Sequence, residues 1–192
     1  MPSIGHFDLL APWYEAVIRP PDPMELRERI RLPAGGALLD AGGGTGRIAQ
    51  FLRDGADPVV VADVSPRMLA EARRKAGLSP VCTPSERLPF PDGCFSRIIM
   101  VDALHHVCDQ RRTAVELWRV LRPGGRLIVE EPDIRSPVVK LIALGERLSL
   151  MRSHFLPPPA IAELFRFPDA DEHVETAPHV AWIIADKRPF RE

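Results

Sequence analysis

Alternating glycines follow an acidic residue in the first third of the chain. The segment reads Asp-Ala-Gly-Gly-Gly-Thr-Gly-Arg over residues 40–47, and it joins an apolar run to a helix-like stretch. Glycine lets a backbone turn sharply and approach a ligand closely. The helix beyond offers unpaired N–H groups and the positive end of its dipole. This turn therefore suits an anionic group, and turns of this kind occur in many nucleotide-binding proteins.

The spacing of the glycines narrows the class of ligand. The dinucleotide pattern G-x-G-x-x-G, started at Gly42, needs a glycine at the position that Arg47 occupies. The glycines instead form G-x-G-x-G. A second acid, Asp63, ends the next apolar run, 19 residues after Gly44. An acid at that place can accept both hydroxyls of a ribose, so the predicted ligand carries a ribose and an anionic group.

The acid before the glycines adds a further constraint on the ligand. Asp40 would disfavour a pyrophosphate beside it, but it is available for a cationic group. The predicted ligand is therefore adenosine-like, with both an anionic and a cationic substituent.

These residues need a scaffold that brings strand ends together. Short apolar runs at 37–39, 59–62, 98–101 and 127–129 each precede a turn signal and a helix-like stretch. The alternation predicts βαβ units and a parallel sheet covered by helices on both faces. Ligands of such folds bind at the carboxyl ends of the strands.

Helices are expected between and after the runs. The patterns place them at 46–54, from Ser65-Pro66 to Gly77, at 109–121 and at 138–150, and the prolines at 157–159 predict a stiff break. Near the end, 172–177 and 180–187 flank Pro178-His179 without room for a crossover helix. They predict a closing hairpin with one antiparallel strand. The fold class is thus α/β, a Rossmann-like, doubly wound, mostly parallel sheet of about seven strands with a closing antiparallel strand.

Composition sets the broad class of the protein. The chain has 192 residues, 45% of them hydrophobic and 27% charged, with a net charge of −1. One globular domain is expected, and intrinsic disorder is excluded. The lack of a basic excess argues against a nucleic-acid partner. The three cysteines form no CxxC pair, and the sequence has neither an apolar run long enough for a membrane span nor a signal-peptide pattern. These observations together predict a cytoplasmic protein.

The set of motifs resembles the class I S-adenosylmethionine-dependent methyltransferases, most closely the branch of the ubiquinone/menaquinone C-methyltransferases. The resemblance extends in order over roughly residues 7–132. Five segments carry it: Phe7–Tyr14, Asp40–Gly46 with Asp63, Ser85–Asp92, Asp102–Val107 and Arg119–Leu127.

The resemblance implies a single methyltransferase domain over 1–192, with an N-terminal lid within 1–30 and a short substrate-side cover at 133–170. It implies in-line methyl transfer from S-adenosylmethionine to a small-molecule acceptor. The predicted cofactor-binding residues are Tyr14, Asp40, Gly42, Gly43, Gly44, Gly46, Asp63, Val64, Ser85, Glu86, Asp102 and Ala103. A homodimer is an open prediction.

Two adjacent histidines are the candidates for catalysis. His105 and His106 follow a predicted strand end, and an imidazole near the methyl group could take a proton from the acceptor. A pair of structural histidines is the competing interpretation. No third ligand lies at metal spacing, so a metal site is not expected.

The chain also departs from the family pattern. Family members usually carry an Asp just before the Ser85 position, where it binds the adenine amino group, and this chain has Pro84. Adenine recognition would then rest on the backbone of Ser85 and Glu86. Two alternatives stay open. Pro84 and the short C-terminal cover leave room for a cofactor-binding but catalytically weak regulatory or assembly protein. The glycine turn and the ribose acid are shared with the dinucleotide-dependent oxidoreductases, although the G-x-G-x-x-G pattern of that class is absent.

Overall fold

The computed structural model describes residues 22–148 and 153–189, which form one α/β unit around a seven-stranded sheet. The strand order is β3-β2-β1-β4-β5-β7-β6. The first five strands pair in parallel, and β7 runs antiparallel to both of its neighbours, β5 and β6. The strands are β1 Ala37–Ala41, β2 Val59–Asp63, β3 Leu78–Cys82, β4 Phe95–Val101, β5 Leu121–Pro132, β6 Ala170–Ala177 and β7 Val180–Lys187.

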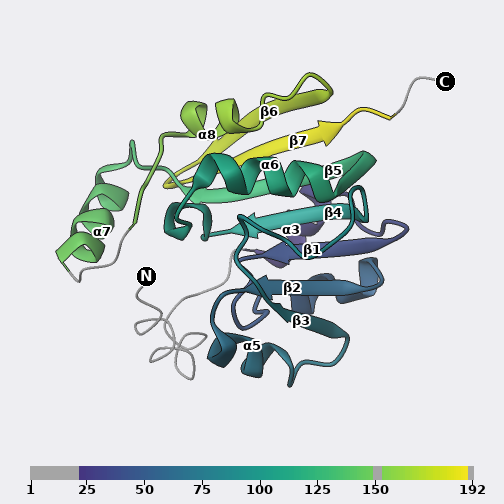
Figure 1. Cartoon of the computed structure of the whole chain (residues 1–192). Coiled ribbons are helices and arrows are strands. Elements are labelled where there is room, and N and C mark those ends of the chain that lie inside the picture. The colour runs from purple at the N-terminus through teal and green to yellow at the C-terminus, as the bar shows by residue number, and fades with distance from the viewer. Residues whose placement is uncertain (1–21, 149–152, 190–192) are drawn as a thin grey trace.

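Helices cover both faces of this sheet (Figure 1). They are α3 Pro23–Arg29, α4 Ala49–Leu52, α5 Pro66–Ala72, α6 Gln110–Val120, α7 Pro137–Leu148 and α8 Pro158–Leu164, with 3-10 turns η1 Arg53–Gly55 and η2 Leu104–His106. Figure 1 shows α6 across the near face of the sheet and α3 behind it. The predicted fold class is confirmed, including the closing antiparallel strand.

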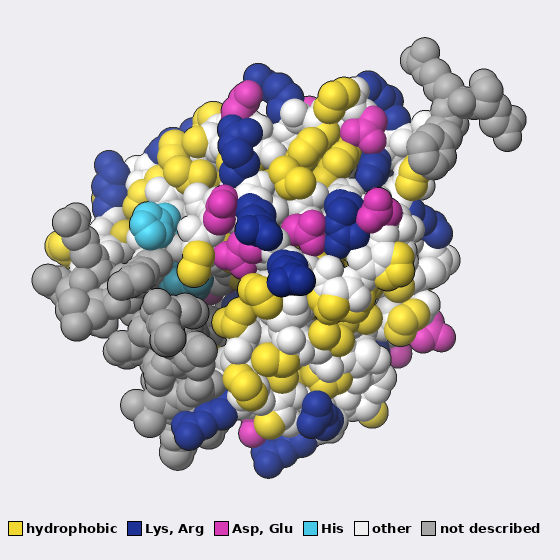
Figure 2. All heavy atoms as spheres, in the orientation of Figure 1, with side chains coloured by type: hydrophobic (Ala, Val, Ile, Leu, Met, Phe, Trp, Pro, Cys, Tyr) yellow, Lys and Arg dark blue, Asp and Glu magenta, His cyan; other side chains and the backbone are white. Residues whose placement is uncertain are grey.

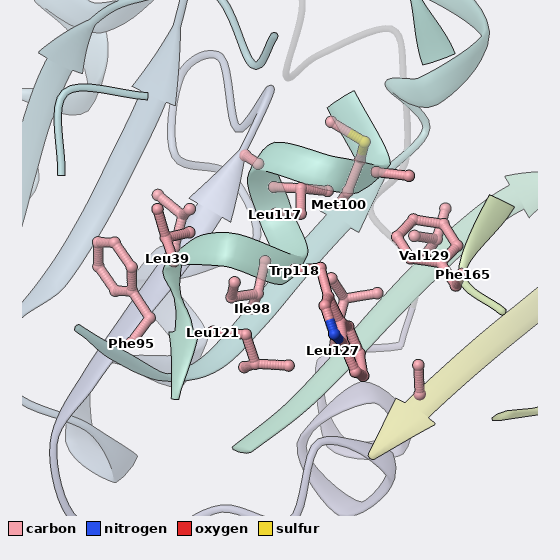
Figure 3. Packing of buried hydrophobic residues seen from close by; sticks show 14 of the residues in the cluster. Leu39, Phe95, Ile98, Met100, Leu117, Trp118, Leu121, Leu127, Val129 and Phe165 are labelled. Carbon is pink, nitrogen blue, oxygen red and sulfur yellow. The ribbon is translucent and has the colours of Figure 1, made fainter. Parts of the chain in front are cut away.

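Two buried clusters hold these layers together. The first lies under α6 and α8, where Leu117, Trp118 and Phe165 pack against Leu39, Ile98 and Leu127 of the sheet (Figure 3). The second lies on the opposite face, under α3, α4 and α5. Because the strands between the two clusters are buried on both sides, they read as continuous apolar runs in the sequence.

Several predicted elements are confirmed by their caps. Ser65 accepts a hydrogen bond from the Met68 N–H at 3.2 Å and begins α5 with a proline at the first helical position. Asp109 accepts a hydrogen bond from the Arg112 N–H at 2.9 Å and begins α6. The predicted hairpin is also present as β6 and β7.

Other expectations at this level were wrong. The helix predicted at 46–54 is limited to α4 and η1, because the chain first turns back on itself at Gly46. The helix predicted to run to Gly77 ends five residues earlier, at Ala72. The stiff break at 157–159 is instead the start of α8, since proline suits the first turn of a helix. Strand β3, not expected from an apolar run, contains Pro80, which an edge strand tolerates.

The parallel strands end at one edge of the sheet, and three of the predicted site residues lie at or next to these ends. They are Asp40 in β1, Asp63 at the end of β2 and Asp102 directly after β4. Among the described residues, no helix is long and apolar enough to cross a membrane.

Candidate cofactor and methyl-transfer site

The glycine loop is fastened to the end of β2 by its own backbone. The N–H groups of Gly42 and Gly43 both donate to the carbonyl of Ala62, at 2.7 and 3.2 Å, and the N–H of Gly46 donates to the Gly43 carbonyl at 2.8 Å. The loop is therefore a rigid turn between β1 and α4, and its shape depends on the neighbouring strand.

Two of its glycines are required by close neighbours. Gly42 has a φ of +71°, and a Cβ there would lie 2.7 Å from the Cβ of Ala103. A Cβ on Gly43 would lie 2.5 Å from the carboxylate of Asp40. The loop thus packs directly on Asp40 beneath it and on the residue that follows β4 beside it.

Asp40 is buried under this loop, with 1% of its surface exposed. The N–H of Ala49 hydrogen-bonds its carboxyl group, but the Oδ2 atom has no hydrogen-bond partner in the described part of the chain. Burial raises the pKa of Asp40 to about 7, and the nearby Asp63 adds to this effect while Arg47 opposes it.

Asp63 ties the loop to the start of α5. Its Oδ2 accepts from the Gly44 N–H at 2.9 Å and its Oδ1 accepts from the Ser65 N–H at 2.8 Å. A carboxylate offers about four acceptor sites, so it can hold the loop and accept ligand hydroxyls together. The next residue, Val64, is 48% exposed on the rim of the site.

The loop after β3 presents backbone donors rather than an acid. Pro84 is exposed, and its carbonyl accepts from the Arg87 N–H at 3.1 Å. In the described part of the chain the N–H groups of Ser85 and Glu86 donate to no other residue. The Glu86 side chain is engaged, since its Oε1 accepts from the Cys108 N–H at 2.8 Å. The Glu86 carbonyl is also engaged, since it accepts from Arg112 Nε at 3.1 Å, so its N–H is the group that remains for the predicted role.

The end of β4 carries a strained acid. Asp102 has a φ of +55° and lies 3.6 Å from the guanidinium of Arg47, which is itself buried. Its N–H donates to the carbonyl of Glu130 at 2.9 Å, so the neighbouring strand supports the turn. The structure thus brings Ala103 against the glycine loop at Gly42 and pairs Asp102 with Arg47, while their predicted role in cofactor binding stays a prediction.

A carboxylate that the sequence analysis missed lies beneath the histidine pair. Glu131, at the end of β5, accepts from the N–H groups of Ala103 and Leu104 at 3.0 and 2.7 Å through Oε1. Its Oε2 lies 2.5 Å from Nδ1 of His105. Both side chains are buried, at 3% and 2% exposure. The available signal was the acidic pair Glu130-Glu131, which directly follows the predicted strand at 127–129.

His106 has a different environment from its neighbour. Burial and repulsion from His105 lower the pKa of His106 to about 3, so its ring is neutral at physiological pH. A base of this strength is poorly matched to proton abstraction near pH 7. The ring centroids of the two histidines lie 4.0 Å apart.

A short strap, residues 153–155, crosses the histidine pair on its way from α7 to α8. The N–H of His154 donates to the His105 carbonyl at 2.7 Å, and the ring of Phe155 stacks on the His105 ring at 4.2 Å. Gln110 fastens the strap from α6, since its Nε2 donates to the His154 carbonyl at 2.7 Å. The strap lies within the region predicted to cover the substrate. Of the other predicted covering element, the lid within 1–30, residues 1–21 with Tyr14 lie outside the described residues, whereas α3 packs its Leu26 into the second buried cluster.

Comparison with known proteins decides the family. Residues 39–129, from β1 through most of β5, match a family model described as a methyltransferase domain. This segment is a class I methyltransferase domain. It contains every predicted cofactor-binding residue except Tyr14.

The methyltransferase domain also has similar curated relatives. A demethylmenaquinone methyltransferase of Thermus thermophilus is 43% identical over 101 residues, which are 49% of this chain and 46% of that protein. A ubiquinone/menaquinone biosynthesis C-methyltransferase of an Enterobacter species is 35% identical over 133 residues, 64% of this chain and 51% of that protein. The chain thus spans about half the length of the curated relatives that it matches.

Solved structures share the fold of the methyltransferase domain at lower identity. An S-adenosylmethionine-dependent methyltransferase from Thermotoga maritima superimposes with a TM-score of 0.75 at 22% identity, covering 95% of this chain and 98% of that one. The YcgJ protein of Bacillus subtilis superimposes with a TM-score of 0.76 at 16% identity, and the match covers 88% of this chain and 98% of that one. The dinucleotide-dependent oxidoreductase alternative finds no support in this family assignment.

Proposed function

We propose that this protein binds S-adenosylmethionine and transfers its methyl group to a carbon atom of a small hydroxylated aromatic acceptor. The observation that carries the cofactor assignment is the buried Oδ2 of Asp40 directly under the glycine loop, which has no hydrogen-bond partner among the residues that the structure describes. A cation nearby favours the ionised form of a buried acid. S-adenosylmethionine has a sulfonium and an ammonium group.

The other residues at this edge fit the rest of the cofactor. Asp63 would accept the ribose hydroxyls while it holds Gly44, and the N–H groups of Ser85 and Glu86 would meet the adenine ring. Asp102 and Ala103 would flank the amino-acid part of the cofactor. When bound, S-adenosylmethionine supplies an activated methyl group, so the chain's residues need only orient the acceptor, exclude water and remove a proton.

The acceptor class rests on the relatives and on the surface. The two curated relatives are named for methylation in quinone biosynthesis, one as a C-methyltransferase and one as a demethylmenaquinone methyltransferase. Figure 2 shows acidic and basic side chains interspersed on the visible face, without a broad basic stripe. We therefore expect a small molecule rather than a nucleic acid. The predicted homodimer and cytoplasmic location stay predictions.

Isothermal titration followed by a methyl-transfer assay tests this function. The protein should bind S-adenosylmethionine and S-adenosylhomocysteine but not NADH, and it should move labelled methyl from S-adenosylmethionine to a short-chain demethylmenaquinol. Binding without transfer to this or related hydroxylated aromatics would favour the catalytically weak, regulatory alternative, which Pro84 supports. If the protein binds neither S-adenosylmethionine nor S-adenosylhomocysteine, the proposal is overturned.

A further inference from the structure

We infer that Glu131 is a positioning residue that sets the tautomer of His105 and so makes its Nε2 the base for methyl transfer. This inference rests on the proposed function, because it concerns the proton that the acceptor loses. The observation behind it is the contact between Glu131 Oε2 and His105 Nδ1.

The contact fixes where the histidine proton resides. An ionised carboxylate only accepts hydrogen bonds, so Nδ1 of a neutral His105 must carry the hydrogen that Glu131 receives. Nε2 is then the ring nitrogen with the lone pair. The neutral ring can therefore take a proton at Nε2, and the carboxylate stabilises the imidazolium that forms.

Glu131 is itself held in place on its other side. Its Oε1 accepts the N–H groups of Ala103 and Leu104, the two residues that lead into η2. Because Ala103 also touches the glycine loop at Gly42, one carboxylate links the candidate base to the wall of the cofactor site. A shift in Glu131 would displace the base relative to the methyl group.

His105 is the better candidate of the two histidines. The Nδ1 of His106 lies 3.3 Å from the Ser153 hydroxyl, and its lowered pKa makes it a weak base. The Phe155 ring of the strap stacks on the buried His105 ring. The same cover keeps bulk water away from the base.

The proton and electron pairs balance over two steps. Nε2 of His105 takes the proton of an acceptor hydroxyl group, and a ring carbon of the resulting phenolate forms the new bond to the methyl carbon while the carbon–sulfur bond breaks with its pair on sulfur. The methylated ring carbon then loses its hydrogen as a proton to water, which restores the aromatic ring, and the imidazolium returns its proton to the ring oxygen.

Glu131→Gln is the decisive variant because it preserves shape but reverses the hydrogen bond. The glutamine Oε1 still accepts from Ala103 and Leu104, whereas its amide N–H faces Nδ1 and forces the ring hydrogen to Nε2. We expect kcat to fall about 10²–10⁴-fold, with the KM for the acceptor and the Kd for S-adenosylmethionine within about twofold. ¹⁵N chemical shifts of the ring should show the tautomer change.

Glu130→Gln is the matched control on the same strand. Glu130 points to the opposite face, where its Oε2 accepts from the Trp182 indole at 2.7 Å. This variant should keep wild-type kcat. His105→Asn, which retains a donor toward Glu131 but lacks Nε2, should lose as much activity as Glu131→Gln, and the double variant should lose no more.

The outcomes separate this inference from the proposed function. Near-normal kcat in folded Glu131→Gln, or an Nε2–H tautomer in the wild type, would overturn the dyad while methyl transfer stands. If Glu131→Gln does not fold, His105→Asn decides, since full activity in that variant excludes His105 as the base. A wild type that binds the cofactor but transfers no methyl group to any acceptor overturns the proposed function and this inference with it.

Discussion

The Gly44 N–H and the Asp63 carboxylate are joined by a 2.9 Å hydrogen bond, so the loop that should cradle the cofactor is held by the acid that should bind its ribose. Asp63 also receives the Ser65 N–H from the start of α5. Cofactor affinity and loop order therefore depend on the same side chain.

Asp63→Ala should weaken S-adenosylmethionine binding by roughly 1.5–3 kcal/mol, because it removes charge-assisted hydrogen bonds to the ribose and frees the loop. Titration calorimetry measures this loss. The control is Asp54→Ala, an acid on η1 whose side chain is 86% exposed and which should change nothing. An affinity equal to the wild type in folded Asp63→Ala would remove Asp63 from the site.

Asp40 should make cofactor binding depend on pH. The apo pKa of about 7 means that the carboxyl group is protonated at pH 6 and ionised at pH 8, and a cationic ligand prefers the ionised form. Binding should be about three- to tenfold weaker at pH 6 than at pH 8. Asp40→Asn should abolish that difference. Any titration of the ligand itself affects both proteins equally and so cancels in the comparison. The same pH dependence in the variant would show that the charge of Asp40 does not contribute to ligand binding.

Pro84→Asp tests the missing adenine contact. The backbone of the loop can accept the change, because Pro84 is exposed and the Arg87 N–H bonds to its carbonyl rather than to its side chain. We expect tighter S-adenosylmethionine binding by roughly 0.5–1.5 kcal/mol, the value of one net hydrogen bond. Unchanged affinity would mean that another group already satisfies the adenine amino group.

Glu130→Gln should stabilise the protein at alkaline pH. Burial raises the pKa of Glu130 to about 7 from an ordinary 4.5, so the folded state holds a proton that the unfolded chain has lost. The wild type's free energy of unfolding therefore falls as pH rises from about 4.5 to 7 and is then level. The variant should gain roughly 1–3 kcal/mol at pH 8 and little at pH 5, measured by urea unfolding. A loss at pH 8 would mean that the carboxylate is stabilised in its charged form.

The parts of the site that lie close together in sequence were predictable, and those that depend on strand register were not. Asp40, the glycines and Asp63 belong to one βαβ unit, whose geometry is repeated in all such folds. Glu131 reaches His105 only because β4 and β5 pair with Val101 opposite Glu130. No local pattern specifies that pairing.

Helix α8 and strand β3 were not predicted, because each contains proline in a local sequence that fits more than one structure. Prolines 157–159 suggest a break, but whether they end one element or begin another depends on what Ile161 and Phe165 can pack against. Pro80 argues against a central strand, and only the strand order shows that β3 is at an edge. In both cases tertiary contacts decide what the local sequence leaves open.

The position of β7 between β5 and β6 sets the order in which the sheet can be completed during synthesis. Strand β6 leaves the ribosome before β7, yet β7 is its only neighbour in the described sheet. The segment at 170–177 must therefore wait for the residues that follow it, and the two can join β5 only as a preformed hairpin or by β7 docking first. A slowly translated stretch between the two strands would prolong the time during which β5 has an unpaired edge.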